Sequence, residues 1–125
     1  MKRIILDTNF ILTCVKQKID FFEYLEMHGI QILIPEQVIN EIKRIAISRK
    51  KMHFKDDAEL SLFILEKNKN KFKKIKLDIK NVDNAIIKYT KKNPDVIIAT
   101  LDREIKKKTS AKNLVIKGKK RLEVA

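Results

Sequence analysis

The sequence contains one cysteine, two glycines and two prolines, and it has no long apolar run. Because Cys14 has no second cysteine to pair with, an internal disulfide is excluded and a reducing, cytoplasmic setting is expected. Met1 leads directly into a strand-like segment without the apolar core of a secretory signal. No segment approaches the roughly 20 apolar residues of a membrane span, so we expect no membrane anchorage. Neither glycine stands in a phosphate-binding loop pattern, so no nucleotide-binding motif is found.

The composition is that of a small globular protein. Of the 125 residues, 44% are hydrophobic and 36% are charged, and a chain of this length builds about one domain. We therefore expect a single domain over residues 1–125. Lysine and arginine total 29 against 16 acidic residues, and the resulting net charge of +13 attracts polyanions. RNA or DNA is the expected class of partner, with a lysine-rich surface that favours solubility as the alternative.

Short apolar runs alternate with stretches of helical periodicity along the chain. The runs predict buried strands at 2–6, 31–34, 96–99 and 114–116, with a strand nearer the sheet edge at 72–79. The periodic stretches predict helices at 10–15, 21–28, 35–46, 57–66, 82–89 and 103–108. This alternation is typical of an α/β fold with three layers, in which helices cover both faces of a mostly parallel central sheet. Sites in such sheets lie beyond the carboxyl ends of the strands.

Acidic residues follow two of the predicted strands. Asp7 comes directly after the strand at 2–6, and Asp102 comes shortly after the strand at 96–99. Both carboxylates are therefore expected at the same edge of the sheet. Asp83 lies in the first turn of a predicted helix, and Glu41 flanks the apolar stripe of another, so four acids can converge. Such a cluster repels both itself and phosphate unless a divalent cation binds. Mg²⁺ or Mn²⁺ prefers these oxygen ligands and supports phosphodiester chemistry.

Each acid also has a purely structural interpretation. Asp7 and Asp102 can cap helices, Asp83 can interact with a helix dipole, and Glu41 can pair with a nearby lysine. Other polar residues beside the predicted site can orient a carboxylate or a water molecule, or can simply act as caps; these are Thr8, Asn9 and Thr100.

The same segments carry a resemblance to a known family. Ile5–Phe10, Val38–Ile42 and Val96–Arg103 resemble the PIN-domain family, especially the archaeal and eukaryotic branch related to ribosomal RNA processing nucleases. The resemblance covers nearly the whole chain and implies a PIN-like fold, metal binding and catalysis by the four acids, endonucleolytic hydrolysis of RNA, and frequent dimerisation. That branch often has two adjacent acids where this chain has Asp83 and Asn84, which argues against a filled second metal site.

Basic segments supply candidate RNA contacts. Phe54 can stack on a base while neighbouring lysines hold phosphates, although a solvated loop with one packed phenylalanine is equally consistent with the sequence. A second track can follow the helix after Asp102 and continue near the end of the chain, where charged helix ends are the alternative. The candidates are Lys50, Lys51, Phe54, Arg103, Lys106, Lys107 and Lys108, with Lys119, Lys120 and Arg121 as a further extension.

The preferred hypothesis is an RNA endonuclease that uses one or two Mg²⁺ or Mn²⁺ ions, with ribosomal RNA processing as a suggested role and a ribosome-assembly factor as a partner. Two alternatives are the toxin of a toxin–antitoxin pair, inhibited by a small protein, and a non-catalytic RNA-binding module. A phosphatase with Asp7 as nucleophile is a weaker alternative, because Asn9 replaces the second aspartate of such enzymes. The sequence alone does not decide among these functions.

Overall fold

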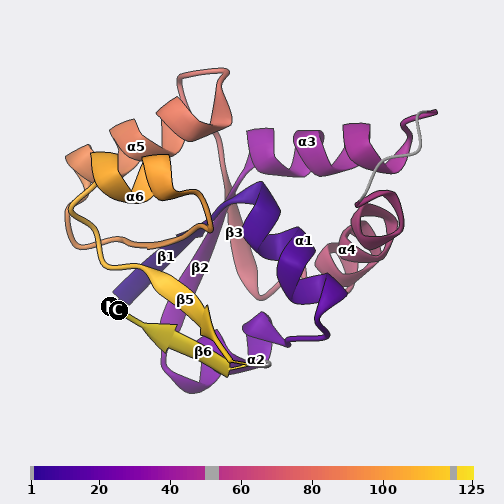
Figure 1. The fold of residues 1–125 in the computed structure, drawn as a ribbon, viewed down its shortest axis with the longest axis horizontal. Coiled ribbons are helices and arrows are strands. Elements are labelled where there is room, and N and C mark those ends of the chain that lie inside the picture. Colours follow the sequence, from indigo (N-terminus) through magenta and orange to yellow (C-terminus); the bar gives the residue numbers. More distant parts are fainter. Residues whose placement is uncertain (1, 50–53, 119–120) are drawn as a thin grey trace.

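The computed structural model describes residues 2–49, 54–118 and 121–125. Strands and helices alternate through most of the chain, as the periodicity predicted (Figure 1). The elements are β1 (Lys2–Leu6), α1 (Thr8–Lys16), α2 (Phe21–Met27), β2 (Ile30–Pro35), α3 (Glu36–Ala46), α4 (Lys55–Lys67), β3 (Phe72–Ile75), α5 (Val82–Lys92), β4 (Ile97–Ala99), α6 (Arg103–Lys108), β5 (Leu114–Lys117) and β6 (Arg121–Val124).

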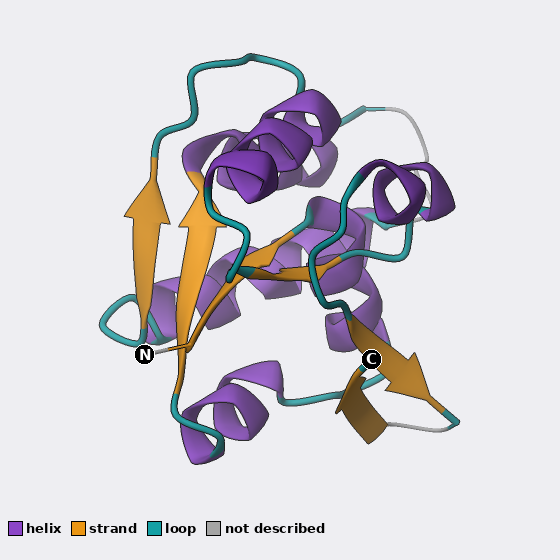
Figure 2. Cartoon of the chain, turned by 90° about the vertical axis from the view of Figure 1, so that its left-hand side faces the viewer, coloured by secondary structure: helices purple, strands orange, loops and turns teal. Residues whose placement is uncertain are grey.

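A four-stranded parallel sheet forms the centre of the fold, with the order β3-β2-β1-β4. Helices α1, α3 and α4 pack together on one side of it, and α5 and α6 lie on the other side (Figure 1). Figure 2 shows helices in front of and behind the strands. The predicted three-layer α/β/α arrangement is therefore confirmed.

Burial explains why these segments form central strands. Ile4, Ile5 and Leu6 of β1 are completely buried, as expected for a strand with helices on both faces. On α3, Val38 and Ile42 are completely buried and lie one helical turn apart. Strand β3 is at the sheet edge, as predicted, and its two lysines face solvent. At the end of α2, the predicted stop at Gly29 is confirmed, with φ at 64°.

The end of the chain differs from the prediction. The strand expected at 114–116 does not join the central sheet; β5 instead pairs antiparallel with β6, which the sequence interpretation missed. An isolated parallel bridge between Ile98 and Asn113 links this segment to β4, and the Ile98 N–H donates to the Lys112 carbonyl at 2.8 Å. Arg121, proposed as part of an RNA track, begins β6. The alternation of charged and apolar residues over Arg121–Val124 was the sequence signal that could have revealed it, and Leu122 is buried between exposed neighbours as that alternation implies.

Strand β3 is also shorter than predicted, because it ends at Ile75 and not at 79. Beyond Ile75 the backbone forms hydrogen bonds with α3. The Gln37 side chain bonds the backbone of Leu77 and the carbonyl of Ile79. Among the described residues, no helix is long and apolar enough to cross a membrane.

Candidate functional site

The strand order places Asp7, and Asp102 shortly after β4, at a switch point of the sheet. Strands β1, β2 and β3 follow one another outward, whereas β4 lies on the opposite side of β1. In open α/β sheets the crevice at such a reversal, beyond the carboxyl ends of the strands, is the usual place for a ligand. Asp7 follows β1 and Thr100 follows β4 at this point, and the Leu6–Ala99 pairing brings them side by side.

A chain of hydrogen bonds joins the residues at the switch point. The Thr100 hydroxyl donates to Oδ2 of Asp7 at 2.9 Å and accepts from the backbone N–H of Asp102 at 3.1 Å. The other Asp7 oxygen, Oδ1, accepts from the N–H of Thr8 at 2.8 Å. Thr100 was a secondary candidate in the sequence, and the structure places it between two of the four acids.

Asp7 is a buried acid, with only 4% of its surface exposed. Burial raises the pKa of Asp7 to about 6, because the surroundings solvate the charged form poorly. The hydrogen bonds from Thr100 and Thr8 oppose this rise. The negative charges of Asp83 and Glu41 add to it, which shows that both acids lie within electrostatic reach of Asp7.

Asp83 interacts electrostatically with Asp102 as well as with Asp7. Asp83 is exposed, and its partial desolvation is the largest cause of its raised pKa, which the charge of Asp102 raises further. Lys108, at the end of α6, lowers it. Asn81 caps α5 by accepting from the N–H of Asn84 at 3.0 Å, which fixes the turn that carries Asp83. The four predicted acids are therefore coupled electrostatically, from Glu41 through Asp7 and Asp83 to Asp102.

The capping interpretation is correct for two acids but does not account for the group. Asp7 caps α1, and Oδ1 of Asp102 accepts from the N–H of Glu104 at 2.8 Å. The alternative for Glu41, an ion pair with a lysine, is not found in the part of the chain that the structure describes. None of the four acids pairs with a described lysine or arginine, although the chain has 29 of these residues.

The donor set suits a hard divalent cation. Asp7 is buried, Glu41 and Asp102 are half-buried, and Asp83 is exposed. A buried carboxylate such as Asp7 is ordinarily paired or bound to metal, and the four acids together offer the oxygen ligands that Mg²⁺ or Mn²⁺ takes. Thr8 adds a buried hydroxyl oxygen without a hydrogen-bond partner in the described residues. No three acidic, histidine or cysteine side chains among the described residues are already arranged as a metal-holding group. Binding therefore requires side-chain adjustment, water ligands or phosphate oxygens.

The predicted RNA contacts are dispersed over the surface. Arg103 and the three lysines lie on α6, directly after Asp102, and Lys108 is within electrostatic reach of Asp83. Asn9 is exposed, two residues after Asp7. Phe54 is half-buried, packs against the core and has the Lys16 ammonium 5.6 Å from its ring centroid, so its stacking on a base stays a prediction. Four lysines proposed as contacts lie outside the described residues; these are Lys50, Lys51, Lys119 and Lys120.

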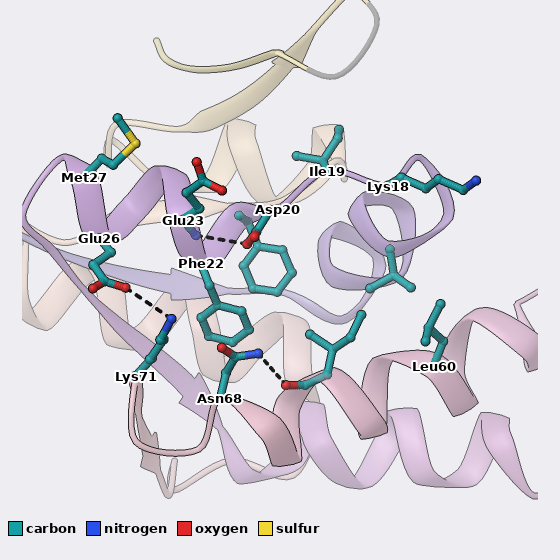
Figure 3. Close-up of a pocket in the computed structure, with 13 residues that line it drawn as sticks. Lys18, Ile19, Asp20, Phe22, Glu23, Glu26, Met27, Leu60, Asn68 and Lys71 are labelled. Atoms are coloured by element: carbon teal, nitrogen blue, oxygen red, sulfur yellow. Dashed lines mark hydrogen bonds and ion pairs between the residues drawn. The ribbon is translucent and has the colours of Figure 1, made fainter.

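A large hollow in the described part of the molecule lies away from the acids. It has a volume of about 890 Å³ and lies between the end of α1, α2 and α4, with Phe22, Met27 and Leu60 on its walls (Figure 3). Asp7 precedes the opposite end of α1, a helix of nine residues that spans about 13 Å at 1.5 Å per residue. None of the four acids lines this hollow, so it is not the place of the acidic site.

Comparison with known proteins identifies the family. A family model described as a PIN-like domain matches residues 4–121. Ribonuclease VapC4 of Methanocaldococcus jannaschii is 33% identical over 131 aligned residues, which cover 99% of this chain and 97% of that protein. The structure of the PIN domain endonuclease Utp24 matches with a TM-score of 0.78 at 24% identity, over 98% of this chain and 90% of that chain.

A second solved structure, VapBC2 from Rickettsia felis bound to a DNA fragment from their promoter, matches with a TM-score of 0.59 at 18% identity. The match covers 89% of this chain and 98% of that chain. At these identities the two structures establish the shared fold alone. The family model and the ribonuclease relative both extend over nearly the whole chain, and they show that it belongs to the PIN-like domain family.

Proposed function

We propose that this protein is a metal-dependent endoribonuclease that hydrolyses RNA phosphodiester bonds at the acidic site. The observation that carries the proposal is the state of Asp7, a buried carboxylate without a described cationic partner and surrounded by acids in a chain of net charge +13. Uncompensated buried charge is costly, so its retention here argues for a bound cation. The ribonuclease relative supports RNA as the substrate.

The four acids are the proposed ligands of one Mg²⁺ or Mn²⁺ ion; they are Asp7, Glu41, Asp83 and Asp102. When bound, such an ion activates water and stabilises charge on the phosphate oxygens. Asn84 offers an amide in place of a second acid beside Asp83. We therefore propose one well-held ion and a weak second site.

The residues around Asp7 have supporting roles. By donating to Oδ2 of Asp7, Thr100 holds the carboxylate in one orientation, and the N–H of Asp102 orients the Thr100 hydroxyl in turn. With its pKa at about 6, Asp7 is ionised above that pH and is then able to bind a cation. Lys108 offsets part of the negative charge around Asp83.

The test compares RNA binding and single-turnover cleavage in Mg²⁺, Mn²⁺, Ca²⁺ and chelator. Cleavage is expected in Mg²⁺ and Mn²⁺, whereas Ca²⁺ should keep RNA bound without turnover, because it is larger and aligns water and phosphate poorly. Asp7→Asn, purified in parallel, excludes a contaminating nuclease. Strong RNA binding with no cleavage in Mg²⁺ or Mn²⁺ would favour the non-catalytic binding module. Release of phosphate from small phosphomonoesters would favour the phosphatase.

Two cellular roles fit this chemistry. Ribosomal RNA processing is one, and the toxin of a toxin–antitoxin pair is the other. The second is favoured by the match to Ribonuclease VapC4 over nearly the full length of both proteins. Sequencing the RNA ends produced on expression in a bacterial host separates the roles, with Asp7→Asn as the control. Cuts confined to precursor ribosomal RNA would reject the toxin role, and growth arrest with cuts in mature RNA would reject processing.

The proposed protein partners follow these roles. An antitoxin belongs to the toxin role and a ribosome-assembly factor to the processing role. A homodimer is a separate proposal based on the family resemblance, and it predicts a mass of about twice 14.7 kDa in sedimentation equilibrium. A monomeric mass at micromolar concentration would reject it.

A further inference from the structure

A second hollow lies at the same edge of the sheet as the acids. It has a volume of about 400 Å³ and lies between α3, which follows β2, and the loop that follows β3. In Figure 1 this loop leaves β3 and leads to the start of α5. Asn40 and Val82 line the hollow, and each directly precedes one of the acids, Glu41 and Asp83. Its volume falls within the range of about 300–1,000 Å³ that is usual for small-ligand sites.

The loop wall of this hollow is held in place by one side chain. The Gln37 amide nitrogen donates to the backbone carbonyls of Leu77 at 2.7 Å and Ile79 at 3.0 Å. The Gln37 side-chain oxygen accepts from the N–H of Leu77 at 3.4 Å. These bonds join α3 to a segment that belongs to no helix or strand. The hollow is therefore preformed, which lowers the entropic cost of binding a ligand.

The lining combines three kinds of chemistry. Arg44, Lys76 and Lys80 supply positive charge, and none of them forms an ion pair with a described acid. Asn40 supplies an exposed amide, and Val82 supplies apolar surface. Two acids are also part of the lining, Glu36 and Asp78. Because these two acids offset much of the positive charge, a bare phosphate gains little net attraction. A nucleotide can contact the basic, amide and apolar groups together.

We propose that this hollow is a subsite for one nucleotide of single-stranded RNA next to the phosphate that is cut, with Arg44 and Lys76 holding its backbone. The proposal rests on the proposed nuclease function for the position of that phosphate. Strand β2 is the neighbour of β1, and strands lie about 4.8 Å apart, so the hollow begins on the order of 5–10 Å from Asp7. One RNA strand can then occupy both the acidic site and this hollow along the edge of the sheet.

The charge test uses the double variant Arg44→Ala with Lys76→Ala. The matched control is Lys43→Ala with Lys74→Ala, which also removes two positive charges, one from α3 and one from β3. These two lysines line a different hollow, whose walls include residues of α4. Affinity is measured in Ca²⁺ by fluorescence anisotropy with a labelled single-stranded 12-mer RNA of mixed sequence. We expect about a tenfold or larger loss for the first pair, and a decrease of about 1.4 in the log–log salt slope if two phosphate contacts are lost. The control pair should stay within about twofold.

A second variant fills the hollow without changing charge. Asn40→Phe places a ring in the cavity, and we expect it to weaken binding of the same RNA by about fivefold or more if a nucleotide must enter. Its melting temperature and its stabilisation by Mn²⁺ report whether the fold and the acidic site are intact. Unaltered affinity in a folded Asn40→Phe variant would overturn the subsite, and so would equal losses in the two double variants.

The two proposals fail separately. If the parent protein binds RNA but does not cut it in Mg²⁺ or Mn²⁺, the nuclease function is rejected while the anisotropy series still tests the hollow. If the parent cuts RNA and either the first pair or a folded Asn40→Phe variant retains full affinity, the subsite is rejected while the nuclease stands. Losses in both variants, with the Lys43 and Lys74 control unaffected, support the subsite.

Discussion

Replacing Asp7 by asparagine is expected to stabilise the metal-free fold while it abolishes cleavage. The pKa of Asp7 is raised from 3.8 to about 6 in the folded chain, and each factor of ten in an acid dissociation constant corresponds to about 1.36 kcal/mol. Ionising Asp7 therefore costs about 3 kcal/mol more in the folded than in the unfolded protein. Asparagine has a similar shape, remains a good helix cap and carries no charge to bury.

The pH dependence of this effect has a definite sign. Below about pH 3, Asp7 is protonated in both states and carries no penalty. Between about pH 4 and 6 the folded chain keeps a proton that the unfolded chain has lost, so the free energy of unfolding falls as pH rises. Above about pH 6 the penalty is complete. The stability gain of Asp7→Asn should therefore be about 1–3 kcal/mol at pH 7.5 and no more than about 0.5 kcal/mol at pH 4.

The measurement is urea unfolding followed by far-ultraviolet circular dichroism at both pH values, in the presence of chelator. The matched control is Asp20→Asn, since Asp20 is an exposed cap of α2 that accepts from the N–H of Glu23 at 3.0 Å. It should change stability by less than about 0.5 kcal/mol, because asparagine and aspartate cap helices almost equally well. A metal-free Asp7→Asn protein that is less stable than its parent at pH 7.5 would refute the reasoning.

Adding Mn²⁺ should reverse the order of stability. An ion that binds only the folded parent at 100 times its dissociation constant stabilises it by about 2.7 kcal/mol. Asp7→Asn, which lacks a central ligand, should gain much less. Equal stabilisation of both proteins by Mn²⁺ would show that the ion binds elsewhere.

Three further predictions concern the surroundings of the acids. Thr100→Val removes the hydroxyl that donates to Asp7, so the pKa of Asp7 and the acid limb of the pH–rate profile should move upward; an unmoved limb, or a Thr100→Ser variant that fails to restore it, would contradict this role. Asn84→Asp should tighten Mn²⁺ binding in calorimetric titration by supplying a second acid beside Asp83, and weaker binding would reject that interpretation. Replacing Lys106–Lys108 by alanine should weaken RNA binding about tenfold at moderate salt and raise the pKa of Asp83, which Lys108 lowers; unchanged affinity would place the RNA track elsewhere.

Local patterns in the sequence were sufficient for the layers of the central sheet, but not for the hairpin at the end of the chain. The fully apolar Ile4–Leu6 predicts a strand covered on both faces, and the spacing of Val38 and Ile42 predicts a helix with one buried stripe. Both predictions are confirmed, because burial of apolar groups acts over a few residues and leaves a period in the sequence. The alternation of such segments predicts parallel strands, whose carboxyl ends share one edge. Local patterns alone therefore predict that Asp7 and Asp102 lie at the same edge of the sheet.

The sequence did not show which strands are neighbours or what the loops contact. The hydrogen bond between Thr100 and Asp7 joins residues 93 positions apart, and Gln37 reaches a loop 40 positions away. No local period encodes such contacts, because they depend on the strand order and on how each loop satisfies its backbone hydrogen bonds. The sequence by itself determined the layers, the sheet edge and the acidic residues that face it. Only the tertiary structure decided that Asp7 is buried without a described cationic partner and that a hollow forms between α3 and the loop after β3, because both follow from packing between distant segments.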